Sequence, residues 1–149
     1  MTTNSCTAPA VSDDDLVTAD DRFARARDAL INAENELVRA TVDLIAMHVR
    51  STYPHAEIVT LIWSDQGDHL DIETAAGATG ETIPAGDWDD FLDRTSLQAY
   101  ASHLIGSARY VWLPYMESLP DGRTRNDADP FRLNIGKTLS RIRFEEATR

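Results

Sequence analysis

The feature that most limits how this chain can fold is a long apolar repeat in its first third. Between residues 23 and 47, apolar side chains recur at alternating steps of three and four, which is the spacing along one side of an α-helix. They are Phe23, Ala26, Leu30, Ala33, Leu37, Ala40, Leu44 and Met47. Pro54 cannot continue a helix. The pattern therefore predicts one long helix that ends just before Pro54.

The start of this helix is predicted from its polar residues. Thr18, followed three residues later by Asp21, has the spacing of a capping box, and Asp20 and Asp21 suit the positive end of a helix. A second apolar flank appears in the later turns, so burial is expected to widen from about residue 37 onward. The residues of this flank are Ile31, Val38, Val42, Ile45 and Val49.

The expected length of the helix raises two alternatives. Some thirty residues at 1.5 Å each make a helix of roughly 45 Å, whereas a globule of this chain length measures about 38 Å across. Either the helix breaks between Asn32 and Asn35, or its polar N-terminal half projects and pairs with another chain. A homodimer joined through residues 20–36 is therefore one expectation.

A β-hairpin is predicted over residues 57–74. The run from Ile58 to Trp63 is β-branched and aromatic, residues 64–68 favour a turn, and Leu70, Ile72 and Thr74 alternate with polar neighbours. Residues 75–80 are expected to form a small-residue turn, and residues 81–83 a short third strand. The first strand is apolar on both faces, so it is expected to lie centrally in the sheet.

Further helices are predicted over residues 87–106, in two stretches separated by Ser96, which is expected to cap the second. Residues 110–116 fit either a buried strand or a loop that seals the core, and residues 131–145 fit either a strand or a helix. The expected fold class is α+β, with the long helix packed on a small antiparallel sheet. Residues 1–15 are expected to be a disordered tail, and residues 16–149 a single domain.

The charge is unevenly distributed. The net charge is -11, and residues 51–93 contain ten acidic residues and no Lys or Arg. Such a surface repels nucleic acid phosphates and acidic lipids, and it attracts basic partners. We therefore expect a basic protein partner, no direct contact with nucleic acid and no membrane association. The basic residues of the C-terminal segment are interpreted as an internal counterweight; they include Arg132, Lys137, Arg141 and Arg143.

The candidate partner-binding residues lie within this acidic stretch. They are Asp65, Asp68, His69, Asp71, Glu73, Asp89 and Asp90. A small metal-assisted hydrolase that uses the hairpin carboxylates and His69 is an alternative. Successive outward residues of a strand stand about 6.6 Å apart, however, which is too far for one ion without ligands from elsewhere. The sequence therefore predicts no catalytic residue, cofactor or metal site, and it favours a non-enzymatic function.

The cellular setting is expected to be the cytoplasm. The chain contains one cysteine, Cys6, which cannot form an internal disulfide, and no stretch is apolar enough for a membrane span. The residues together predict a small acidic interaction module that acts as an inhibitor, an immunity-type protein or a nucleic-acid mimic. A structural homo-oligomer and the metal-assisted hydrolase are the alternatives.

Overall fold

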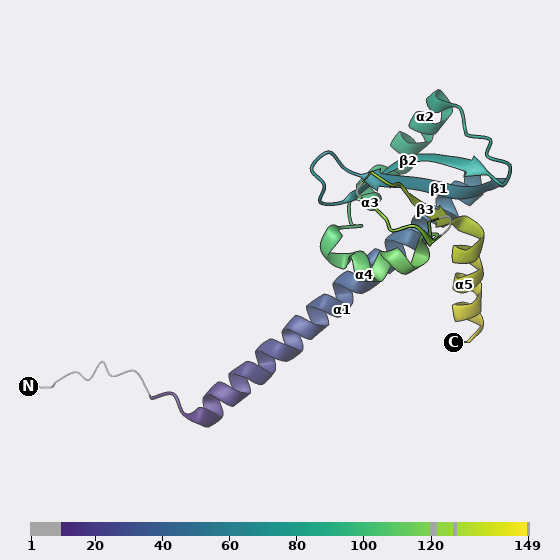
Figure 1. Cartoon of the computed structure of the whole chain (residues 1–149). Coiled ribbons are helices and arrows are strands. Elements are labelled where there is room, and N and C mark those ends of the chain that lie inside the picture. Colours follow the sequence, from purple (N-terminus) through teal and green to yellow (C-terminus); the bar gives the residue numbers. More distant parts are fainter. Residues whose placement is uncertain (1–9, 120–121, 127, 149) are drawn as a thin grey trace, which may run out of the picture. The chain divides into compact units, whose positions relative to one another are not determined.

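The computed structural model describes residues 10–119, 122–126 and 128–148 (Figure 1). The fold is α+β, as the sequence predicts. Its elements are α1 (Asp13–Thr52), β1 (Ala56–Trp63), β2 (Leu70–Gly77), α2 (Ala85–Thr95), α3 (Leu97–Ala101), η1 (Gly106–Ala108), α4 (Arg109–Trp112), η2 (Leu113–Tyr115), β3 (Phe131–Asn134) and α5 (Ile135–Ala147). The chain forms two compact units that meet between Glu34 and Asn35. The predicted single domain stays a prediction.

The helix α1 begins earlier than predicted. The backbone N–H of Asp15 donates to the hydroxyl of Ser12 at 3.1 Å, and the backbone N–H of Ser12 donates to the Asp15 carboxylate at 3.3 Å. This reciprocal pair is a capping box, so the cap is Ser12 and the prediction of Thr18 was wrong. Residues 1–9 of the predicted disordered tail lie outside the described residues, and residues 13–15 are helical.

The buried face of α1 is the second apolar flank, from Val38 to Val49, and not the main row, which is the apolar repeat between residues 23 and 47. Within the second unit, the buried apolar residues of α1 are Val38, Val42, Ile45, Ala46 and Val49. Leu37, Leu44 and Met47 are exposed instead, with relative exposures of 49%, 39% and 50%. Over these turns the flank supplies branched side chains at every contact, whereas the main row is interrupted by Ala40. The flank offers β-branched side chains to the core, and Val38, Val42, Ile45 and Val49 are each nearly or fully buried.

The sheet has three antiparallel strands in the order β2-β1-β3, with β1 in the middle as predicted (Figure 1). Thr60 pairs with Thr74 but Leu61 pairs with Ile72, so Glu73 is an extra residue in β2, a β-bulge. The bulge reverses the alternation of the strand, because Leu70 and Ile72 are buried before it and Ala75 is buried after it.

The bulge explains one wrong prediction about the hairpin. Residues 75–77, expected in a turn, continue β2 because Ala75 returns to the core after the bulge. A second prediction was also wrong: residues 81–83 form no strand of the sheet and make only an isolated bridge between Thr82 and Ala76. The third strand is β3, which pairs with β1.

The two helices predicted over residues 87–106 are present as α2 and α3, and α3 ends at Ala101 instead of near residue 106. Trp88, Phe91 and Leu92 of α2 are buried on one face, as predicted. Ser96 does not cap α3 with its side chain; its backbone has φ 57° and makes the left-handed turn between the two helices. The helix α3 ends at Ala101 because the next residues turn back to β2, where the carbonyl of Leu104 accepts from the N–H of Leu70 at 3.1 Å.

The last third of the chain completes the core. Residues 131–145, which fit both a strand and a helix, form both in succession, β3 and then α5. Residues 110–115, expected to form a strand or a loop, are helical instead, and Trp112 is fully buried there. Met116 is extended and forms an isolated bridge with Leu133. The Trp112 ring lies edge-on to Phe131 at 5.0 Å and to Trp63 at 5.9 Å between ring centroids. These three rings join β1, β3 and α4 in one aromatic cluster.

Among the described residues, no helix is both long enough and apolar enough to cross a membrane.

Candidate functional site

Five of the predicted partner-binding residues lie on the hairpin between β1 and β2. The backbone N–H of Ser64 donates to the carbonyl of His69, and the N–H of Gly67 donates to the carbonyl of Ser64, both at 2.8 Å. Gly67 has φ 73°, a left-handed conformation that glycine adopts without strain. These bonds close a tight loop that leaves the side chains of Asp65 and Asp68 exposed.

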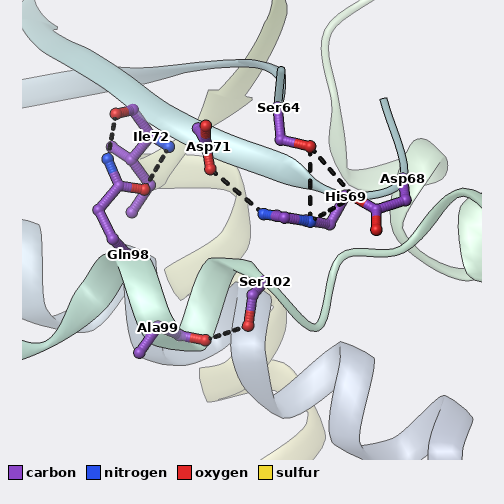
Figure 2. A network of polar contacts seen from close by, with 8 residues as sticks. All are labelled: Ser64, Asp68, His69, Asp71, Ile72, Gln98, Ala99 and Ser102. Carbon is purple, nitrogen blue, oxygen red and sulfur yellow. Dashed lines mark hydrogen bonds and ion pairs between the residues drawn. The ribbon is translucent and has the colours of Figure 1, made fainter. Parts of the chain in front are cut away.

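The side chains at the base of this loop form a polar network (Figure 2). The His69 ring lies between two carboxylates, with Nδ1 2.7 Å from Asp68 Oδ1 and Nε2 3.4 Å from Asp71 Oδ1. The hydroxyl of Ser64 donates to Asp68 Oδ1 at 3.1 Å. The hydrogen bond with His69, and then that with Ser64, lower the pKa of Asp68 below its usual range. The Asp68 carboxyl group therefore stays ionised to a lower pH than a free carboxyl group does.

This network holds the loop and does not activate a nucleophile. A catalytic serine needs an accessible hydroxyl and a base of its own. Ser64 is 8% exposed, and its Oγ is 3.5 Å from the same His69 Nδ1 that lies much closer to Asp68. Among the residues that the structure describes, no three His, Cys, Asp or Glu side chains are grouped to hold a metal ion. The hairpin residues of the hydrolase alternative are thus not arranged as a metal-ligand set.

The other two predicted residues, Asp89 and Asp90, are exposed on α2. Asp90 lines an open groove of about 650 Å³, whose other lining residues are Tyr53, Asp87, Phe91, Asp93 and Arg94. The Tyr53 ring lies edge-on to Phe91, with 5.3 Å between their centroids. Phe91 is only 1% exposed, so the groove combines three carboxylates and Arg94 with the partly buried Tyr53 ring.

The structure thus places the seven predicted residues in two groups and not on one element. Asp65, Asp68, His69, Asp71 and Glu73 belong to the hairpin, and Asp89 and Asp90 belong to α2. Among the described residues, no hydrogen bond or ion pair links the two groups. Sequence reasoning did not identify Ser64, Tyr53 or Asp87 as part of these surfaces; a turn-flanking serine is the signal that was available for Ser64.

The outer edge of β2 is covered by other parts of the second unit. The Gln98 side chain of α3 accepts from the N–H of Ile72 at 2.8 Å and donates to its carbonyl at 2.7 Å (Figure 2). At the start of β2, the N–H of Leu70 donates to the carbonyl of Leu104, and in the preceding loop the carbonyl of Asp68 accepts from the N–H of Gly106. A partner therefore meets side chains at this edge and not a free row of backbone groups.

Residues 51–93, which contain no Lys or Arg and are called the base-free stretch, carry carboxylates that mostly have no basic neighbour in the fold. Of its ten acidic residues, Glu57 alone lies within 4 Å of an Arg or Lys nitrogen in the described part of the chain, at 3.5 Å from Arg50. Among the basic side chains of the described residues, the His69 ring alone lies within this distance of Asp68 and Asp71. The fold therefore does not neutralise this charge internally.

Comparisons of the chain with protein-family models, with curated proteins and with solved structures gave no match.

Proposed function

We propose that the protein is a non-enzymatic interaction module that binds a basic protein partner through the acidic surface of residues 57–93. The observation that carries this proposal is the lack of internal neutralisation: one of the ten carboxylates in the base-free stretch has an Arg or Lys within 4 Å among the described residues. Carboxylates that are not paired within the fold are available to a partner. An inhibitor, an immunity-type protein or a nucleic-acid mimic uses such a surface.

The two groups of carboxylates suit different parts of a partner. The hairpin group presents charge at an exposed loop, which attracts a basic surface over a distance and speeds encounter. The α2 groove offers three carboxylates, those of Asp87, Asp90 and Asp93, against one basic residue, Arg94, and it places them beside the partly buried Tyr53 ring. A guanidinium group binds carboxylates by charge-assisted hydrogen bonds and packs on aromatic faces. The groove therefore fits an arginine side chain of the partner.

The test uses a fluorescent octa-arginine peptide as the basic probe. Replacing both Asp71 and Glu73 by Lys is expected to weaken binding roughly tenfold, because close charge pairs at the surface are lost. The matched control replaces Asp21 and Asp28 by Lys; it makes the same change in net charge on α1, far along the sequence from the hairpin. Anisotropy titrations at about 50 and 300 mM NaCl measure the affinity and its salt dependence.

Equal effects of the hairpin and control variants would contradict the proposed surface, since binding would then follow net charge alone. The natural partner is sought by pull-down from host lysate with elution in a salt gradient. Release of one basic protein at moderate salt, with loss of its binding to the Asp71→Lys, Glu73→Lys variant, would support the proposal. A partner that is indifferent to both salt and the substitutions would contradict it.

A further inference from the structure

The helix α1 carries an exposed apolar row along its length, which we call the α1 seam. It consists of Leu16, Ala19, Phe23, Ala26, Leu30, Ala33, Leu37, Ala40, Leu44 and Met47. In the first unit, Phe23 is 67% exposed and Leu30 59%, and the other seam residues there are exposed as well. In the second unit, Leu37, Ala40, Leu44 and Met47 are also exposed.

The seam is distinct from the face of α1 that packs on the core. In the second unit, the buried face follows Val38, Val42, Ile45 and Val49. At 100° per residue, the centre of the seam lies roughly 150° around the helix from the centre of this buried face. The core of the second unit therefore leaves the seam uncovered.

The spacing of the seam is that of a coiled coil. Large residues recur every seven positions from Leu16 to Leu44. Three residues after each of the first four comes an alanine of the small row, which consists of Ala19, Ala26, Ala33 and Ala40, and Met47 follows Leu44 at the same distance. On a straight α-helix, a seven-residue repeat drifts by about 20° per heptad, and a supercoiled partner helix removes this drift. A repeat held over five heptads therefore matches a partner helix better than it matches a flat sheet.

The alternation of large and small residues favours an antiparallel partner. In a parallel pair of identical helices, each layer repeats one residue, so Phe23 would meet Phe23 and Ala26 would meet Ala26. In an antiparallel pair, Phe23, Leu30, Leu37 and Leu44 each face an alanine across the interface, and Leu16 at either end faces Met47. Facing large and small side chains interdigitate at even density, so the antiparallel arrangement fills every central layer alike.

The charges beside the seam favour the same orientation and set the register. Parallel pairing places Asp13–Asp15 and the segment Arg22–Arg27 level with their own copies, where like charges repel. Antiparallel pairing centred between Ile31 and Asn32 places Arg27 beside Glu34 of the second copy. The three aspartates at the start of α1 then lie level with the segment that contains His48 and Arg50 of the second copy. Such complementarity selects orientation more than it adds affinity.

We propose that α1 binds α1 of a second copy of this chain as an antiparallel coiled coil centred between Ile31 and Asn32. Leu30 packs against Ala33 of the second copy at the centre, and Phe23 packs against its Ala40. This surface is separate from the acidic surface of residues 57–93, and it does not rest on the function proposed for that surface.

Sedimentation of the full chain between about 1 and 200 µM tests the association. We expect a dimer that becomes a monomer when Phe23 and Leu30 are both replaced by Glu. The matched control replaces Val17 and Ile31 by Glu, two exposed apolar residues of α1 outside the seam, and is expected to stay a dimer. Circular dichroism confirms that each variant keeps its helix. A monomer throughout, or equal behaviour of both variants, would overturn the proposal.

Spin-label distances in the dimer test the orientation. Asp14→Cys and Asp28→Cys are labelled separately in a Cys6→Ser background. In the antiparallel pair, the two labels are offset along the axis by roughly 50 Å at position 14 and roughly 10 Å at position 28. A parallel pair gives equal distances at both positions and would overturn the proposed orientation. Arg27→Glu is expected to weaken the dimer, and adding Glu34→Arg is expected to restore it.

Discussion

The hydroxyl of Ser64 and the ring of His69 show how single residues position the acidic hairpin. The Ser64 hydroxyl and the His69 Nδ1 both approach Asp68 Oδ1, and the second ring nitrogen of His69 approaches Asp71. The histidine therefore keeps two carboxylates close together that would otherwise repel each other.

The contact between Asp68 and His69 predicts a pH-dependent stability. Because the pKa of Asp68 is lowered in the folded state, the contact stabilises the fold above the usual pKa of a free carboxyl group, and this contribution is lost as the pH falls through the lowered pKa. Asp68→Asn is therefore expected to lower the urea midpoint at about pH 7, and to lower it by less near pH 3, where the pH is already below the usual pKa of a free carboxyl group. Asp65→Asn, in the same loop, is the control and is expected to change neither. A constant difference at both pH values would contradict this assignment.

At the scale of the elements, α1 shows how one helix can present two apolar faces. The branched residues from Val38 to Val49 pack in the core, and the α1 seam remains outside it. Both faces were visible in the sequence, but the periodic pattern alone did not tell which of them meets the sheet. The sequence predicted that burial widens from about residue 37 onward, whereas in the second unit the buried residues follow the flank and Leu37, Leu44 and Met47 are exposed.

Neighbouring residues of α1 test this assignment of faces. Ile45→Ala is expected to reduce the free energy of unfolding by about 2–5 kcal/mol, because it leaves a cavity in the core. Leu44→Ala is expected to change it by no more than about 0.5 kcal/mol, since its side chain is exposed in the single chain. Urea denaturation at a protein concentration below that of dimer formation measures both. Equal losses for the two variants would contradict the assignment.

The other elements divide into those that local patterns predict and those that depend on distant contacts. The alternation of Leu70 and Ile72 predicted the start of β2, and the spacing of Trp88 and Phe91 predicted the buried face of α2. The bulge at Glu73 and the early end of α3 were not predictable in this way, because both depend on pairing with distant residues. The sequence contains capping-box patterns at both Ser12 and Thr18. The prediction placed the start of the helix at Thr18, whereas the cap that forms is Ser12.

At the scale of the whole molecule, the candidate site was predicted by composition and not by geometry. The base-free stretch identified which residues are acidic and exposed, and the structure places them on the hairpin and on α2. Their separation into two groups follows from the path of the chain between β2 and α2, which no short motif encodes. The Tyr53 ring joins the α2 groove from the residue after α1, so no local pattern around α2 could have indicated it.

The two proposed surfaces together predict an effect of valency. A dimer offers two acidic surfaces, so it binds a dense array of basic groups more tightly than a single copy does. Leu30→Glu is expected to leave the affinity for soluble octa-arginine unchanged and to weaken binding to a surface coated with that peptide by roughly 100-fold. Anisotropy and surface plasmon resonance measure the two affinities. Unchanged binding in both formats would contradict a dimer with two accessible acidic surfaces.

The small row of the α1 seam places an unusual restriction on how this chain can change over time. In a single copy, Ala19, Ala26, Ala33 and Ala40 face solvent, where a larger side chain costs nothing. In the antiparallel pair, each is the space that receives a large residue of the second copy. Related sequences that keep the pair should therefore vary little at these four exposed positions, while Asp14, Asp21 and Asp28 on the opposite side of the same helix vary freely.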